Sequence, residues 1–166
     1  MSDCPIVGIP EVSSENRRYL PVGELEPGVI ISNKVYGAVD PEGFLFAIAS
    51  SSMFMVWMKT VGGRLESRIS FSSTITWNNF ALPALGDATR QRIIAAGQKV
   101  LAARELHPER SLAEHYNPLA MDPALVKAHD ALDKEVDRAM GAPRKLTSER
   151  QRQELLFKNY SSLNGN

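Results

Sequence analysis

The feature that most constrains the fold is a change in apolar spacing close to Pro83. Before this point the apolar residues come in short runs, such as CPIVGIPEV and GVIISNKVYGAV, bounded by Gly, Pro and Asp, a pattern typical of β-strands. After it, apolar residues recur at helical spacing. We therefore expect an α+β fold with a first part at residues 1–82 and an all-helical second part at residues 83–166.

The first part is expected to combine a small mixed sheet with one buried helix. Residues 43–59 are apolar on nearly all sides, as in a core helix, so Trp57 and its neighbouring methionines are interpreted as core rather than as a stacking platform. Gly62 and Gly63 would end this helix, one of them able to adopt the left-handed conformation. The segment 64–80, RLESRISFSSTITWNNF, is expected to form a loop followed by strands.

Capping signals divide the second part into helices. A helix of about five turns is expected after Asp87, which is available as its cap. Ser111 and Glu114 have the spacing of a capping box that opens a short helix. Asp122 precedes a proline suited to the first helical position, and a last helix begins near Thr147. The face of the helix after Asp122 is formed by Leu125, His129, Leu132, Val136 and Met140.

Charge and composition exclude several protein classes. The formal net charge is zero, with six Lys and Arg against eight Asp and Glu up to Phe80 and thirteen against eleven after it, so neither part is a basic patch. The single cysteine, Cys4, excludes an internal disulfide and fits a reducing, cytoplasmic setting. The start of the sequence lacks signal-peptide features, and the longest apolar stretch, residues 44–58, is too short to span a bilayer, so no membrane partner is expected.

Motifs for catalysis are missing from the sequence. It has neither a Gly-rich cofactor loop after a strand nor the Asn/Asp-Pro-Pro-aromatic motif of adenine methyltransferases. A phosphate loop, a zinc-protease helix and a Gly-x-Ser-x-Gly elbow are also missing. The histidines, His107, His115 and His129, lack a compact metal-ligand spacing, and His107 is interpreted as a helix-end residue. We expect no catalytic, cofactor-binding or metal-binding residue in this chain.

Three stretches of the first part, IPEVSSENRRYLPVG, VIISNKVYGAV and VGGRLESRISFSSTITWNNFALP, carry a family resemblance. Together they resemble the target-recognition region of the MmeI-like (type IIL) restriction–modification enzymes, large single chains that join a nuclease, an adenine methyltransferase and one DNA-reading domain. The later segments SLAEHYNPLAMDPALVKAHDALDKEVDRAM and LTSERQRQELLFKNY resemble the helical C-terminal segment of that family. The resemblance implies double-stranded DNA and the remaining domains of a parent methyltransferase as partners, with S-adenosylmethionine bound elsewhere in the parent.

The resemblance also implies particular contact residues. In this family the base-reading side chains follow Ile-Pro, form an Asn-x pair after the next strand, and alternate after Gly-Gly-Arg-Leu. Side chains of these types can hydrogen-bond base edges in the major groove. The three that follow Gly-Gly-Arg-Leu alternate along the chain, so in an extended segment they would point to one side. Carried over, the base-reading residues are Glu11, Asn33, Lys34, Glu66, Arg68 and Ser70. The possible phosphate contacts, which fix register without reading sequence, are Arg17, Arg18, Lys59 and Arg64.

Five of the six reading residues have a structural alternative. Glu66 and Arg68 could be an exposed ion pair of little energetic weight. Asn33 could support its own turn, Lys34 could be a solubilising charge, and Glu11 could end a strand.

Two other functions remain open at this level. The chain could be an adaptor that docks a larger methyltransferase subunit through its helical half, or a small independent enzyme. Family members are several times longer, so we expect a fragment, a gene remnant or one piece of a split system. Part of the sheet could then expose an unpaired edge.

Overall fold

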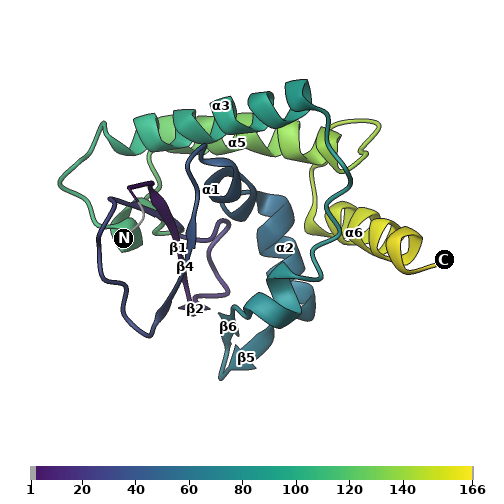
Figure 1. Cartoon of the computed structure of the whole chain (residues 1–166), viewed down its shortest axis with the longest axis horizontal. Helices are drawn as coiled ribbons and strands as arrows, with labels where there is room; N and C mark the ends of the chain where they lie inside the picture. Colours follow the sequence, from purple (N-terminus) through teal and green to yellow (C-terminus); the bar gives the residue numbers. More distant parts are fainter. Residues whose placement is uncertain (1–2, 166) are drawn as a thin grey trace.

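Helices and sheets lie on different sides of the molecule in the computed structural model, which describes residues 3–165 (Figure 1). The helices are α1 (Phe44–Ala49), α2 (Ser52–Val61), the π-helix η1 (Ser73–Trp77), α3 (Asp87–Arg104), α4 (Leu112–His115), α5 (Pro123–Ala139) and α6 (Glu149–Asn164). The two long helices α3 and α5 pack side by side, α1 packs against α3, and α2 contacts α5 and α6. The predicted α+β class is confirmed. Within the described range, none of the helices is long and apolar enough to cross a membrane.

Within residues 3–165, the strands form two three-stranded sheets. The strand orders are β3 (Gly23–Leu25), β1 (Ile6–Pro10), β4 (Val35–Val39) and β2 (Val12–Ser13), β6 (Arg68–Ser70), β5 (Gly63–Leu65). Every pair of neighbouring strands is antiparallel. The sheets are therefore purely antiparallel, whereas a mixed sheet was expected. For β5 and β6 the reason is their two-residue connection, because parallel neighbours need a long crossover.

The predicted helix at residues 43–59 is wrong as one element, because the chain breaks it into α1 and α2 at Ser50 and Ser51. The Ser51 hydroxyl donates to the Ile48 carbonyl (2.7 Å) and accepts from the Phe54 N–H (3.2 Å), so it ends one helix and caps the next. Serine side chains compete in this way with the helical hydrogen bonds of the backbone. Trp57 and the methionines of α2 are buried in the core as expected.

The segment after α2 also differs from its prediction. Gly62 ends α2 in an extended conformation rather than a left-handed one, and a Cβ there would lie 2.4 Å from the Met58 carbonyl oxygen. The β5–β6 hairpin follows at once, so β6 supplies a strand within the segment, but η1 forms in its later part, where strands were also expected. Local hydrogen bonds explain η1, since the Ser72 hydroxyl accepts from the Ile75 N–H and Thr76 bonds back to the Ser72 carbonyl.

The helical part follows its capping signals closely. Ser111 and Glu114 form the predicted capping box, and Asp122 caps α5 by accepting from the Ala124 N–H (2.8 Å). The predicted Asp87 cap is wrong, since Gly86 is the N-cap of α3 and Asp87 lies in the first turn. A carboxylate there still stabilises the helix through the macrodipole.

The interpretation of His107 as a residue whose ring contacts helix-end carbonyls needs revision. Its Nε2 atom lies 3.0 Å from the Asp122 carboxylate, so the ring joins the chain after α3 to the start of α5. The nearby carboxylate competes better for an imidazole than neutral carbonyls do.

One hydrophobic core joins the two parts of the chain. Residues of β1, α1, α2, α3 and α5 belong to the same buried cluster. The contact between α1 and α3 is so close that a Cβ at Gly97 would lie 2.7 Å from the Ala47 Cβ. In addition, the buried Arg104 guanidinium on α3 donates to the Val22 carbonyl (2.8 Å). The sheets are therefore held in a fixed position on the helices.

Candidate nucleic-acid interface

The three stretches that contain the predicted base-reading residues meet at Glu11. This residue lies between β1 and β2, where its N–H donates to the Lys34 carbonyl (2.9 Å) and its carbonyl accepts from the Phe71 N–H (2.8 Å). Its carboxylate lies 3.0 Å from the Lys34 ammonium. Glu11 therefore joins the turn before β4 to the end of β6, and it connects the two sheets.

Asn33 and Lys34 form an exposed turn directly before β4. The turn is supported by Ser32, whose hydroxyl accepts from the Lys34 N–H (3.3 Å) and whose carbonyl accepts from the Val35 N–H (3.1 Å). This geometry leaves the Asn33 amide on the surface, beside the Glu11–Lys34 ion pair. The turn thus carries an exposed amide next in sequence to the ammonium that pairs with Glu11, and these groups offer different hydrogen-bonding capacities.

The β5–β6 hairpin corrects one expectation about the third stretch. Glu66 is not in an extended segment with Arg68 and Ser70; it lies in the two-residue turn, with a φ of 58°. The cause is the pairing of Leu65 with Arg68, which leaves two residues to reverse the chain and favours a positive φ. The Glu66 carboxylate still lies 3.5 Å from the Arg68 guanidinium, and both side chains are exposed.

Arg68 and Ser70 lie on one face of their sheet, because they alternate with the fully buried Ile69. Cross-strand pairing places Leu65 and Val12 on the same face. This sheet lies at the end of the molecule away from the α3–α5 layer (Figure 1). We call the surface formed by this face and the Glu11 junction the reading face.

Three of the four predicted phosphate contacts form ion pairs within the protein. Arg64 pairs with Ile69 and so lies on the opposite face of the hairpin, 3.7 Å from the Glu15 carboxylate. Arg18 and Lys59 form 2.6 Å ion pairs with Asp130 and Glu149 of the helical part, and Arg17 is half-buried. The structure therefore does not bring Arg18 and Lys59 together with the reading face.

Comparison with known proteins identifies the family of the chain. A model of the MmeI target recognition domain matches residues 1–84, and a model of the MmeI C-terminal domain matches residues 85–166. The chain belongs to the MmeI family. The resemblance drawn from the sequence is confirmed.

Two proteins similar to this chain are much longer than it is. DNA methyltransferase A of Bacillus subtilis (strain 168) is 37% identical over 155 residues, which are 93% of this chain and 17% of that protein. The structure of the type IIL restriction–modification enzyme MmeI in complex with DNA is similar with a TM-score of 0.93 and 37% identity, covering 99% of this chain and 22% of that one. The chain thus spans less than a quarter of the length of either relative.

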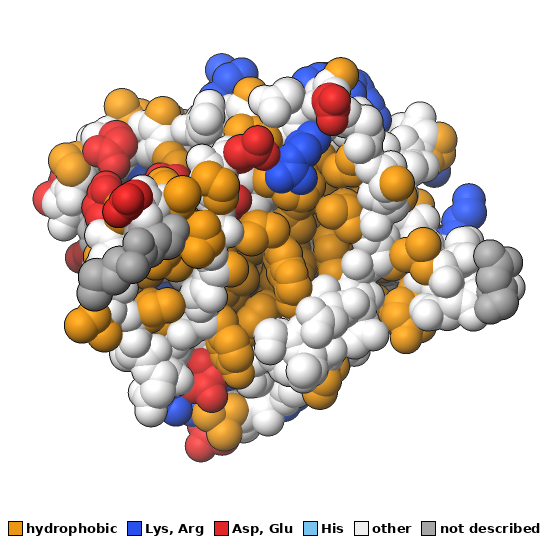
Figure 2. Space-filling model, viewed as in Figure 1, with side chains coloured by type: hydrophobic (Ala, Val, Ile, Leu, Met, Phe, Trp, Pro, Cys, Tyr) orange, Lys and Arg blue, Asp and Glu red, His pale blue; other side chains and the backbone are white. Residues whose placement is uncertain are grey.

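An apolar hollow beside the reading face was not foreseen from the sequence. Figure 2 shows exposed apolar side chains gathered at the centre of one face of this MmeI-family chain. A hollow of about 110 Å³ lies between the first sheet, α1 and η1. Tyr36 and Phe71 meet there edge to face at 4.9 Å, and Phe71 directly precedes Ser72 at the end of the second sheet. Tyr36 is 39% exposed in a strand whose neighbouring residues are also exposed, so the sequence pattern gives no signal for this hollow.

Proposed function

We propose that this chain is the DNA-sequence-reading module of a larger S-adenosylmethionine-dependent adenine methyltransferase, where it contacts the base edges of a short target. One observation carries the proposal: residues 1–84 match a target recognition domain, in a fold similar to that of the DNA-bound MmeI enzyme. Double-stranded DNA and the remaining domains of the methyltransferase are its partners in this proposal. The module would work in the cytoplasm, where the bacterial chromosome lies.

The chemistry of the reading face supports base contact. Arg68 can donate to guanine, Asn33 can pair with the adenine edge, and Glu11 can accept from the cytosine amino group. Ion pairs such as Glu11–Lys34 and Glu66–Arg68 are exposed and contribute about 0–1 kcal/mol. The side chains of these pairs can therefore leave one another and bind base edges at a small cost in free energy.

In this proposal the parent enzyme binds S-adenosylmethionine through other segments, and the junction where a strand leads into α1 supports this. The junction between β4 and α1 is the place where a strand leads into a helix. There the Asp40 carboxylate accepts from the Leu45 N–H (3.1 Å) and the Phe46 N–H (2.8 Å), so the helix N-terminus is already capped. Among the described residues, no group of His, Cys, Asp and Glu is suited to a metal ion. We propose that this module selects the site and that other domains perform the methyl transfer.

The proposal is tested by changing Arg68 in a full-length enzyme that carries this chain. We expect Arg68→Ala to relax one position of the methylated motif, because a good bidentate base contact contributes about 1–3 kcal/mol of discrimination. Glu66→Lys with Arg68→Asp should relax or switch that position. The measurement is methylation-site sequencing of the genomic DNA of expressing cells.

The matched control is Arg92→Ala on α3. Arg92 is also an exposed arginine in an ion pair, with Glu135, but it lies in the helical part. An unchanged motif in both Arg68 variants, with methylation retained, would remove Arg68 from the set of reading residues and favour the adaptor.

The adaptor remains a second candidate because α6 exposes apolar side chains. Phe157 and Leu163 are 50% and 61% exposed, and they could dock another subunit. In that case Phe157→Asp would dissociate the subunits, and Arg68→Ala would leave the motif unchanged. Co-purification of the subunits distinguishes the two functions.

A further inference from the structure

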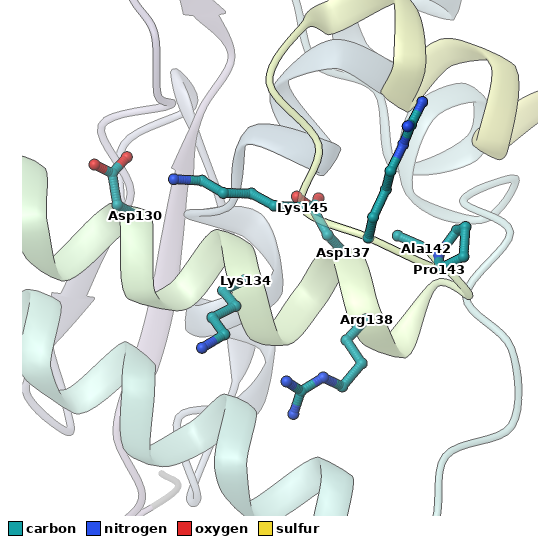
Figure 3. A pocket seen from close by; sticks show the side chains of 8 residues that line it. Asp130, Lys134, Asp137, Arg138, Ala142, Pro143 and Lys145 are labelled. Atoms are coloured by element: carbon teal, nitrogen blue, oxygen red, sulfur yellow. The ribbon is translucent and has the colours of Figure 1, made fainter.

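Three adjoining pockets form one continuous trough on the helical part. The pocket of about 350 Å³ between α5 and the loop before α6 shares Lys134 and Lys145 with a second of about 220 Å³. The second shares Arg18 and Arg152 with a third of about 300 Å³ that reaches Glu149. Figure 3 shows the first of these pockets, where side chains from α5 and from the following loop both contribute to the lining.

The carboxylates of this trough already have hydrogen-bond or ion-pair partners within the protein. Asp137 accepts two hydrogen bonds from the Arg152 guanidinium, at 3.0 and 2.8 Å, and Asp130 pairs with Arg18 at 2.6 Å. Asp133 accepts from the N–H and the hydroxyl of Ser52 at 2.7 and 2.6 Å. Burial also raises the pKa of the Asp133 carboxyl. The floor of the trough therefore offers little free negative charge.

The cations on the rim, in contrast, remain available. Lys134, Arg144 and Lys145 are exposed, and within residues 3–165 none of them forms an ion pair with a carboxylate. Arg138 adds a fourth charge, held only by a 3.8 Å contact with Glu135. The surface is thus locally cationic although the whole chain carries no net charge.

The trough leads toward the hairpin that contains Arg68. At its α6 end Glu149 lies 2.6 Å from the Lys59 ammonium, and the Lys59 carbonyl accepts from the Arg64 guanidinium (3.3 Å) on β5. These contacts join the trough to the face of the hairpin opposite Arg68. An elongated cationic surface matches the repeating charge of a nucleic-acid backbone.

We propose that this cationic trough binds the phosphate backbone of duplex DNA, with Lys134, Arg144 and Lys145 as the contact residues. The proposal rests on the proposed DNA-reading function and extends it to the helical part. Phosphate contacts contribute affinity without sequence preference. Their loss should therefore weaken binding to every duplex and leave the methylated motif unchanged.

The test compares two triple variants of this chain by fluorescence anisotropy with a labelled random-sequence duplex over a series of salt concentrations. In the trough variant Lys134, Arg144 and Lys145 are changed to Ala. In the control variant the exposed Lys99, Lys127 and Lys158, which do not line the trough, are changed to Ala, giving the same loss of charge. Circular dichroism checks that both variants remain folded.

The trough variant should bind about 10- to 100-fold more weakly at low salt, and the slope of log affinity against log salt should fall by about 2 to 3. The control variant should change much less. Equal losses in both variants, an unchanged slope, or a wild-type chain that binds no duplex at low salt would overturn the trough proposal. The Arg68 motif measurement tests the reading function separately, so failure of one proposal is distinguishable from failure of the other.

Discussion

At the scale of single residues, Asp133 on α5 is the buried carboxylate that holds the two parts of the chain together. It is 4% exposed and accepts two hydrogen bonds from Ser52 at the N-terminus of α2. The positive end of the α2 dipole and the Arg152 guanidinium at 3.8 Å both favour a negative charge there. A buried carboxylate is costly without such partners, and a shift of α2 along α5 would remove them. The contact therefore fixes the position of α2 on α5.

We expect Asp133→Ala to lower the free energy of unfolding by about 3–5 kcal/mol, since it leaves two buried donors of Ser52 without an acceptor and removes one of the two carboxylates beside the buried Arg152 guanidinium. The matched control is Asp130→Ala, which breaks the exposed pair with Arg18 and should cost about 0–1 kcal/mol. Urea unfolding measures both. Equal costs for the two variants would contradict this account of the interface.

His129 predicts a pH dependence of stability. Burial lowers its pKa to about 3 from the ordinary 6.5, while its Nε2 atom lies 2.7 Å from the Tyr116 hydroxyl. Below pH 6.5 the unfolded chain binds a proton that the folded chain does not, so stability falls as the pH falls toward 3. Between pH 7.5 and 5 this contributes a loss of about 2 kcal/mol.

Urea unfolding of the wild type and of His129→Gln at both pH values checks this. The variant is expected to be less stable at pH 7.5, because its side chain packs less well, but its stability should change less with pH. The same pH dependence in both proteins would show that other groups cause it.

At the scale of elements, the helices with local signals were predictable and the elements made by distant contacts were not. The box of Ser111 with Glu114 and the cap at Asp122 contain their partners within a few residues, so the sequence alone locates those helix starts. The turn at Glu66 depends on the pairing of β5 with β6, and β6 is positioned by β2, far away in the chain. Periodicity cannot detect such pairing.

The candidate site divides in the same way. The family resemblance placed Glu11, Lys34 and Ser70 in separate stretches, and the structure brings these stretches together at the Glu11 junction. The trough cations Lys134 and Lys145 have no motif, because their availability depends on which carboxylates are already paired. Pairing of that kind is a property of the folded chain.

The α1–α3 contact gives a prediction for an element. A Gly→Ala change inside a helix usually stabilises it by about 1 kcal/mol. At Gly97 we expect the opposite, a loss of about 1–3 kcal/mol, because the new Cβ would lie 2.7 Å from the Ala47 Cβ. Gly86→Ala is the control, since a Cβ there meets no atom within 4 Å. Thermal unfolding compares the two variants, and a more stable Gly97→Ala protein would refute the close contact.

At the scale of the whole molecule, one core fixes the reading face and the cationic trough relative to each other. The sheets and the helical part share buried residues from β1 to α6. A rigid module of this kind can present a base-reading hairpin and a phosphate-binding surface in one geometry, without paying ordering entropy at the moment of binding. Its neutral net charge fits the proposal of a module with weak intrinsic affinity that expresses its specificity within a longer enzyme.

The most direct test of the central claim is to transfer the module. The segment of Bacillus subtilis DNA methyltransferase A that matches this chain is replaced by residues 1–166, and the methylated motif of the resulting enzyme is sequenced in cells lacking other methyltransferases. If this chain reads the target, methylation should move from the motif of the recipient enzyme to a new motif. Methylation that continues at the original motif would contradict the claim that sequence recognition lies in this chain.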